Sequence, residues 1–301
     1  MLAFPFKMPV PYKEVKCYAA LFICMLTKAI HIELVSDLST PSFLLALRRF
    51  ISRRGKPTTI HSDNGTNFVG ASSKLKELST FITERKNQNP IEDFMSNQGV
   101  TWKFIPPHAP HFGGLWEAGI KSMKNHLRKV MGTHVLSFEE MSTVLTQIES
   151  VLNSRPLFPL SSDPCDLNPL TPSHFLIGRP AASIPDEDLV SQAENSVKTY
   201  EKLQRLYQLF WKRWSMEYIS TLQERTKWKR NGLDQVKPGM LVLVKEENLP
   251  PLHWKLGRVT DCHAGEDGVV RVVTVQCVNN KLKRPVTKIF PLPKDPFDSN
   301  N

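Results

Sequence analysis

The chain has 301 residues, of which 41% are hydrophobic and 23% charged, and it carries a formal net charge of +10. This composition excludes a collagen, a coiled coil and a largely disordered chain. The longest apolar run, residues 19–26, is far shorter than the roughly 20 residues that span a bilayer, so no membrane partner is expected.

The N-terminus and the cysteines point to an intracellular protein. A signal peptide is the weaker interpretation of the apolar run, because no small-residue cleavage site follows it. The five cysteines form no Cys-x-x-Cys pair. We therefore expect free, buried thiols and a location in the nucleus or the cytoplasm.

The excess of positive charge lies in the last third of the chain. Residues 198–301 hold 19 basic and 11 acidic side chains, whereas residues 1–197 hold 20 and 18. A basic module attached to a nearly neutral one favours a polyanionic partner. A solvated surface of Lys and Arg would have the same composition, so charge alone leaves both interpretations open.

The first half of the chain predicts strands alternating with helices. The predicted helix 40–54 begins with Thr40 as its N-cap, followed by Pro41. The predicted helix 138–153 is preceded by a capping box, Ser137-x-x-Glu140. Strands are predicted at 15–25, 29–35, 58–62 and 101–105, and helices at 40–54, 72–85, 114–131 and 138–153. This order predicts an α/β layer fold with a mixed sheet.

The second half predicts a different architecture. Residues 154–197 contain seven prolines and read as a linker that packs on the first domain. A long helix follows at 198–229, with aromatic residues that we assign to a core. Strands are predicted at 240–245, 254–261, 269–278 and 284–289, which suggests a small SH3-like β-barrel. The predicted domains are a catalytic core (1–153), a linker (154–197), a connecting helix (198–232), a basic barrel (233–293) and a tail (294–301).

Two carboxylates stand out as candidate site residues. Asp63 ends a predicted strand and precedes Asn64-Gly65, which is also the composition of an ordinary turn. Glu117 lies in the first turn of a predicted helix, where an acidic side chain also complements the helix dipole.

Three cations share the helix face of Glu117. At about 100° per residue, Glu117, Lys121, Lys124 and Arg128 fall within about 60° of one another. Such a face could hold a phosphodiester backbone while a carboxylate-bound metal acts at its end. A solvated amphipathic helix would show the same pattern.

The predicted barrel is rich in basic side chains. They lie on its short strands and turns, and the DNA-binding candidates are Lys255, Arg258, Lys283 and Arg284. We expect contact with the DNA backbone without reading of base sequence. The alternative is that several of these residues only solvate the edges of a small barrel.

Long segments of the sequence resemble a known family. His61–Gly70 (HSDNGTNFVG) and Phe104–Gly119 (FIPPHAPHFGGLWEAG) resemble the integrase core of long-terminal-repeat (LTR) retrotransposons. Thr27–Leu38 and Leu152–Leu157 narrow the resemblance to the Bel/Pao group. The C-terminal third is similar to the module that follows the integrase core in those polyproteins.

The resemblance implies a ribonuclease-H-like core and DNA integration, by 3′-end processing and strand transfer. Three carboxylates (Asp, Asp, Glu) of such cores bind two divalent ions, Mg²⁺ or Mn²⁺. By motif match Asp63 is the second carboxylate and Glu117 the third. The resemblance also implies element and target DNA as partners and a possible homo-oligomer.

One position departs from the family pattern. The match places Met1 where the first Asp of the family stands, so we expect a truncated first strand, unpaired backbone groups on its neighbour and inactivity in two-metal chemistry. The alternative function is a non-catalytic DNA-binding remnant or a domesticated transposon-derived protein, and a general nuclease is a weaker third. His108 and His111 are weak candidates for metal ligation.

Overall fold

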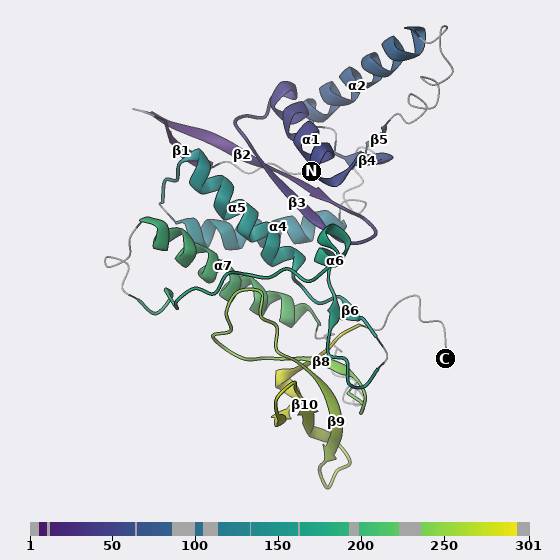
Figure 1. Ribbon diagram of the computed structural model, residues 1–301, viewed down its shortest axis with the longest axis vertical. Coiled ribbons are helices and arrows are strands. Elements are labelled where there is room, and N and C mark those ends of the chain that lie inside the picture. Colours follow the sequence, from purple (N-terminus) through teal and green to yellow (C-terminus); the bar gives the residue numbers. More distant parts are fainter. Residues whose placement is uncertain are drawn as a thin grey trace. The chain divides into compact units, whose positions relative to one another are not determined.

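The computed structural model describes residues 6–10, 13–63, 65–85, 100–104, 114–132, 134–161, 163–192, 199–222 and 236–293 (Figure 1). The chain divides into two compact units, residues 1–149 and 150–301. In the part of the chain that is described, no helix is long and apolar enough to cross a membrane. All five cysteines are free, but Cys24 and Cys165 are exposed rather than buried as predicted.

The first unit combines antiparallel and parallel strand pairs with helices, as expected for a mixed α/β fold. Its three-stranded antiparallel sheet has the order β1-β2-β3, and β4 pairs in parallel with β5. The elements are β1 (Phe6–Val10), β2 (Lys13–Ile23), β3 (Ile30–Val35), α1 (Thr40–Arg54), β4 (Thr59–Ser62), α2 (Thr66–Arg85), β5 (Thr101–Phe104), α4 (Gly114–Met131) and α5 (Phe138–Asn153), whose last residues belong to the second unit.

Most predicted elements are confirmed, and three details are corrected. The strand β1 pairs with β2 from Phe6↔Cys17 to Val10↔Lys13, so the expected loss of a ladder partner along this stretch of β2 is wrong. The N-cap of α1 is Ser39, whose hydroxyl accepts from the Ser42 N–H at 3.3 Å, and not Thr40. The helix α2 begins at Thr66 rather than at Ser72.

The capping box of α5 is confirmed. The Ser137 N–H donates to the Glu140 carboxylate at 2.7 Å, and the Glu140 N–H donates to the Ser137 hydroxyl at 3.2 Å. The apolar positions of this helix are buried, with Met141, Val144 and Ile148 all at most 1% exposed. Here the periodicity of the sequence and the fold agree.

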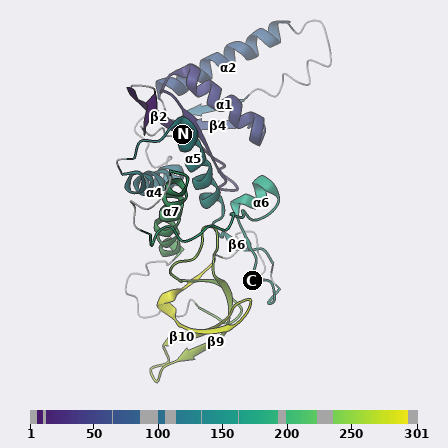
Figure 2. The same ribbon diagram turned by 60° about the vertical axis from the view of Figure 1, so that its left-hand side comes forward.

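Helices α1 and α2 pack closely against each other (Figure 2). Phe43 and Leu47 of α1 form one apolar cluster with Phe68 and Ala71 of α2. A Cβ atom at Gly70 would lie 2.3 Å from the Thr40 hydroxyl, so only glycine allows this approach. The start of α2 is therefore fixed by its contact with α1.

A cluster of charged side chains is buried at β3. His31, Glu33 and Glu149 are 4%, 4% and 8% exposed. The His31 ring contacts Glu33 through Nε2 at 2.9 Å and Glu149 through Nδ1 at 3.2 Å. Three arginines of α1 complete the cluster: Arg49 and Arg53 pair with Glu33, and Arg54 pairs with Glu149.

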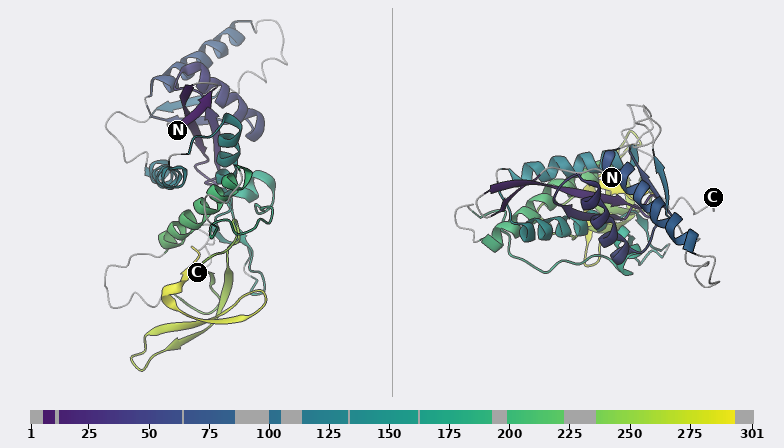
Figure 3. Two further views of the ribbon diagram at one scale, coloured as in Figure 1. Left: turned by 90° about the vertical axis from the view of Figure 1, so that its left-hand side faces the viewer. Right: turned by 90° about the horizontal axis from the view of Figure 1, so that it is seen from above.

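The second unit contains a long helix and a five-stranded antiparallel sheet. The sheet order is β11-β10-β9-β8-β12, and β9 and β10 form a hairpin (Figure 3). The elements are β6 (Phe158–Pro159), β7 (Pro169–Leu170), α6 (Pro172–Ile177), α7 (Thr199–Leu222), β8 (Leu241–Val244), β9 (Leu256–Ala264), β10 (Val270–Gln276), β11 (Lys281–Pro285), the 3-10 helix η3 (Val286–Lys288) and β12 (Ile289–Pro291).

This order is consistent with the predicted SH3-like module, with two corrections. From β8 to β11 each strand pairs with the next one in the chain, and β12 pairs with β8 rather than with β11, so the described strands form an open sheet and not a closed barrel. The predicted strand 284–289 is divided by η3, because Pro285 removes a ladder donor at the end of β11. The five-domain division of the chain stays a prediction.

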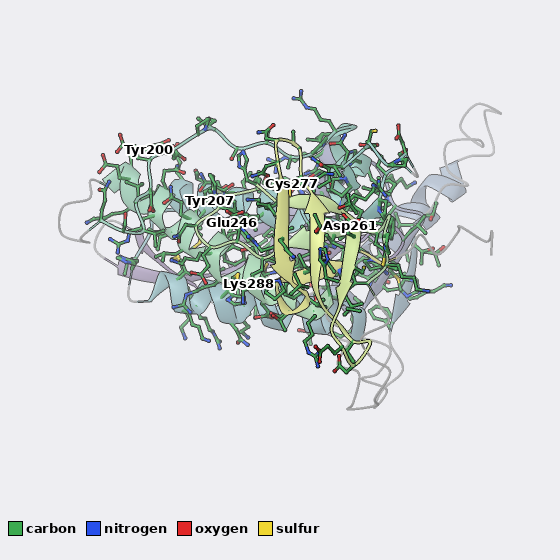
Figure 4. The ribbon with its side chains drawn as sticks, turned by 90° about the horizontal axis from the view of Figure 1, so that it is seen from below. Tyr200, Tyr207, Glu246, Asp261, Cys277 and Lys288 are labelled. Carbon is green, nitrogen blue, oxygen red and sulfur yellow. The ribbon has the colours of Figure 1, made fainter. Side chains whose placement is uncertain are left out.

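Aromatic residues of α7 form part of a core, as predicted. The Trp211 and Trp214 rings lie 4.8 and 6.2 Å from the Trp254 ring, and Tyr218 stacks on Trp214 at 5.5 Å. Tyr200 is the exception, because 67% of it is exposed (labelled in Figure 4). The predicted helix to residue 229 is described as far as Leu222, and residues 223–235 lie outside the described part.

The buried cluster at β3 predicts a pH-dependent stability. Burial disfavours the charged His31 ring and lowers its pKa, but hydrogen bonds and charges from Glu149 and Glu33 outweigh this effect, so the pKa of His31 lies above 6.5. The resulting stabilisation is complete below pH 6.5 and is lost as the pH rises through the folded-state pKa. Burial raises the pKa of Glu33, but its bonds to His31 and Arg49 lower it below 4.5. Its contribution is therefore lost only in acid.

We expect the free energy of unfolding to fall between pH 6 and pH 9 in the wild type. His31→Gln should lower the stability at pH 6 and flatten this fall. The measurement is urea unfolding at each pH, with the exposed His61→Gln as the control that keeps the wild-type slope. An unchanged slope in His31→Gln would contradict the assignment.

Candidate functional site

The backbone before Asp63 is held by two side chains of the β4–β5 pair. Ser62 is 1% exposed, and its hydroxyl accepts a hydrogen bond from Trp102 Nε1 of β5 at 2.9 Å. The same hydroxyl donates to the Asp63 carbonyl at 2.9 Å. Asp63 is therefore the residue directly after the end of β4, where the last strand residue, Ser62, is buried and hydrogen-bonded.

The Asp63 side chain is exposed and lies where α2 begins. Its Oδ1 accepts the Gly65 N–H at 3.0 Å, which is the turn that the sequence predicted. The Gly65 carbonyl in turn accepts the N–H groups of Phe68 and Val69 in the first turn of α2. The positive end of that helix favours a negative charge here.

Gly65 leaves room for two oxygen atoms. A Cβ atom at this position would lie 3.1 Å from Asp63 Oδ1 and 3.0 Å from Asn67 Oδ1. Because glycine has no Cβ, the carboxylate oxygen of Asp63 and the amide oxygen of Asn67 can both lie close to the Gly65 backbone. Hard oxygen donors of this kind suit Mg²⁺ or Mn²⁺, so the surroundings of Asp63 fit a divalent cation.

The second candidate carboxylate lies on α4. Glu117 occupies the first turn of this helix, which begins at Gly114 as predicted. The side chains of residues 114–122, including Glu117 and Lys121, lie outside the described part, as do His108 and His111. Among the described side chains no three His, Cys, Asp or Glu lie together as metal ligands. A joint site of Asp63 and Glu117 stays a prediction.

The described part of α4 has the predicted amphipathic pattern. Met123, Leu127 and Val130 are buried, at 1%, 1% and 8% exposed. Arg128 is exposed, while Lys124 is half-buried and has an interaction within the protein. Of these two predicted DNA-binding cations, Arg128 is the more accessible.

The prediction for Arg258 needs correction. Arg258 is 9% exposed, and its guanidinium donates to the carbonyls of Gly239, Asp163 and Asp166 at 2.7 to 2.8 Å. A buried guanidinium with three carbonyl acceptors holds the turn at 163–166 onto β9 and is not free to bind phosphate. This contact was missed because its acceptors lie far away in the sequence.

The other basic candidates of the sheet differ in accessibility. Lys255 forms an ion pair with Glu246, and Arg284 is half-buried with a bond from Nη1 to the Lys283 carbonyl. Lys281 and Lys283 are exposed, and their register partners on β10 are Gln276 and Thr274. Since alternate residues of a strand share a face, both ammonium groups lie on the polar face of β11.

The sequence pattern also indicates Lys281 as a candidate. The period of two in Lys281-x-Lys283 is the signal that places both on one face of a strand. Arg284 falls on the opposite face, where its partner on β10 is the fully buried Val273.

Comparison with protein families gives matches for two parts of the chain. Residues 5–110 match the integrase core domain, and residues 198–292 match DUF5641, a family of unknown function. The chain is thus similar to an integrase core domain in its first part and to a DUF5641 domain in its last. This combination is consistent with an LTR retrotransposon integrase.

Solved structures include distant likenesses. An intasome structure of simian T-cell lymphotropic virus in complex with PP2A regulatory subunit B56 gamma matches with a TM-score of 0.40 at 12% identity, over 97% of this chain and 77% of that chain. The magnesium-bound HTLV-2 integrase catalytic core in dimeric form has a TM-score of 0.28 at 19% identity, over 43% and 69% of the two chains. A comparison with curated proteins found no match.

The corrected role of Arg258 gives a prediction about stability. Arg258→Ala leaves three carbonyls without their donor, so we expect the free energy of unfolding to fall by about 2–4 kcal/mol. Lys283→Ala, on the same sheet but exposed, should change it by less than about 0.5 kcal/mol. Urea unfolding followed by tryptophan fluorescence reports mainly on this unit, which contains four of the six tryptophans of the chain. Equal effects of the two substitutions would contradict the structural role.

Proposed function

We propose that this chain is a DNA integrase-type protein of the Bel/Pao group of LTR retrotransposons, acting in 3′-end processing and strand transfer. The observation that carries the proposal is the integrase core match over residues 5–110, with Asp63 exposed at the end of β4. Its setting fits a divalent cation, and the resemblance adds Glu117 as a second ligand. An intracellular location, in the nucleus or the cytoplasm, is part of the proposal.

The proposed metal site uses hard oxygen ligands. Asp63 and Glu117 would hold Mg²⁺ or Mn²⁺, and the ions would stabilise the charge of the entering and leaving oxygens at a DNA phosphate. The chain's own residues keep Asp63 in place: Trp102 and Ser62 fix the backbone before it, and Gly65 holds one of its oxygens. The other carboxylate oxygen, Oδ2 of Asp63, has no hydrogen-bond partner among the described residues. The hydrogen bond of Oδ1 to the Gly65 N–H fixes the orientation of the carboxylate.

DNA would be held by exposed cations on both units. Arg128 of α4 and the pair Lys281 and Lys283 of β11 are exposed. We infer contacts to the phosphate backbone, which position DNA without reading its sequence. The resemblance further suggests a homo-oligomer on paired DNA ends.

A second candidate function is DNA binding without strand transfer. It is favoured by the exposed pair Lys281 and Lys283 on β11, which need no metal ion to bind a phosphate backbone. A chain that acts in this way keeps its affinity for DNA when divalent ions are removed.

Nicking of supercoiled plasmid DNA in Mg²⁺ or Mn²⁺ tests the proposed chemistry. Asp63→Asn removes a charged metal ligand without changing the size of the side chain, so we expect the nicking rate to fall about a hundredfold or more. Glu77→Gln, an exposed carboxylate on α2, is the control that should leave the rate unchanged. Undiminished nicking by Asp63→Asn would exclude the assigned site.

The two candidate functions are separated by one further comparison. DNA affinity is measured by fluorescence anisotropy in Mg²⁺ and in EDTA, beside the nicking assay. Nicking in Mg²⁺ that Asp63→Asn removes supports the first candidate. DNA binding that EDTA and Asp63→Asn leave unchanged, with no nicking, supports the second candidate.

The DNA contacts predict a specific dependence on salt. Each neutralised phosphate contributes a slope of about −0.9 to the plot of log K against log salt concentration. The double substitution Lys281→Ala and Lys283→Ala should therefore weaken binding to unrelated DNA sequences alike and reduce the slope by about two. The measurement is fluorescence anisotropy with a labelled duplex. Glu266→Gln on the same sheet module is the control, and an unchanged slope in the double variant rules out β11 as a DNA contact.

A further inference from the structure

The second unit contains a cavity of about 640 Å³ that the proposed chemistry does not use. It lies between α7, the segment 246–255 that follows β8, and the segment 186–191. All of its lining residues belong to the same unit. A cavity of this size is typical of a binding site for part of a ligand.

Two indole rings form the apolar part of the cavity wall. Trp211 and Trp254 line it, with their ring centroids 4.8 Å apart in an edge-to-face arrangement. Their N–H groups are already bonded, to the Leu249 carbonyl at 2.9 Å and the Ser154 hydroxyl at 3.2 Å. The rings therefore offer the cavity apolar surface and no free donor.

A largely buried serine also lines the cavity. Ser215 of α7 is 8% exposed, and its hydroxyl makes no hydrogen bond among the described residues. The hydroxyl oxygen is not one of the buried atoms that lack a partner, so it is accessible and can bond to a ligand group.

The charged groups around the cavity are mainly acidic. Asp186, Asp188 and Glu247 line it and are exposed. The ammonium group of Lys255 is already paired with Glu246, and that of Lys212 lies 3.5 Å from Asn248 Oδ1. His253 is the other titratable residue of the lining. The unpaired carboxylates thus outnumber the unpaired cations, although the chain as a whole is basic.

The acidic segment is fixed in place before any ligand arrives. The Leu189 N–H donates to Gln208 Oε1 at 2.9 Å, and Gln208 Nε2 donates to the Glu187 carbonyl at 2.7 Å. Farther along, the Ser183 hydroxyl donates to the Pro251 carbonyl at 2.9 Å. Because the segment is already ordered, a ligand need not bear the entropy of ordering it.

We propose that this cavity binds a lysine or arginine side chain from a basic peptide of a partner protein. The aliphatic stem packs on the indoles of Trp211 and Trp254, and the cation contacts Asp186 and Asp188. The Ser215 hydroxyl accepts a hydrogen bond from the same cation. The acidic lining repels phosphate, so this function is distinct from DNA binding on β11.

The test is fluorescence anisotropy of a fluorescein-labelled hexalysine peptide titrated with the full chain. The double substitution Asp186→Asn and Asp188→Asn keeps side-chain size, and the Asn at 188 still accepts the Val190 N–H. We expect about fivefold weaker binding, because exposed ion pairs contribute modestly. The matched control removes two exposed carboxylates outside the cavity, Asp163→Asn and Glu266→Gln, and should bind as the wild type does.

A second variant tests the cavity without changing its charge. Ser215→Ala removes the unpaired hydroxyl from a helix that tolerates alanine, and we expect about threefold weaker binding of hexalysine. Circular dichroism confirms that each variant is folded.

Three outcomes would overturn the proposal. Equal weakening in the matched control means that hexalysine responds to overall surface charge. Unchanged binding in Ser215→Ala, or in the Asp186 and Asp188 variant, means that the cavity is not the site. Self-association in analytical ultracentrifugation that the Asp186 and Asp188 variant abolishes identifies a second copy of this chain as the occupant.

Discussion

The buried carboxylate of Glu149 ties together three parts of the first unit that are distant in sequence. One of its oxygens accepts the Ile32 N–H at 2.8 Å and so pairs one backbone donor of β3. The same carboxylate meets His31 of β3 and Arg54 of α1. Removing one partner of a buried ion pair costs about 3–5 kcal/mol, because the other charge stays without water and without a counter-ion. The strand and both helices are therefore fixed to one arrangement.

The position of Asp63 depends on this arrangement through a chain of contacts. The charged cluster holds α1 against β3, and α1 packs on α2 through Phe43 and Phe68. Since α2 begins immediately after the turn of Asp63 and Gly65, its placement also directs the carboxylate. From the other side, Trp102 and Ser62 fix the strand that leads to Asp63. The candidate ligand thus takes its orientation from both the apolar core and the buried charges.

The elements of this fold could be predicted from local patterns, whereas long-range pairing could not. The bounds of α4 and α5 follow from helical periodicity and the Ser137 capping box, both of which lie within a few residues. Neither the partners of Glu149 nor the carbonyls that bind Arg258 are close to them in sequence. The basic composition of the module therefore predicted a DNA contact for Arg258, whereas its guanidinium is buried and donates to backbone carbonyls. The division of the strand at 284–289 was missed although Pro285 was a local signal for it.

Net charge is a weak guide to the partners of the second unit, because its charges are sorted in space. On β11 the period of two places Lys281 and Lys283 on one polar face, with an apolar core behind the sheet. At the cavity beside α7, the segment 186–191 and Glu247 place carboxylates around an aromatic wall. A polyanion is favoured at the first surface and repelled at the second, and the reverse holds for a basic peptide. Under the two proposals, one small unit with an excess of positive charge would therefore distinguish two oppositely charged partners by the sign of the charge at each surface.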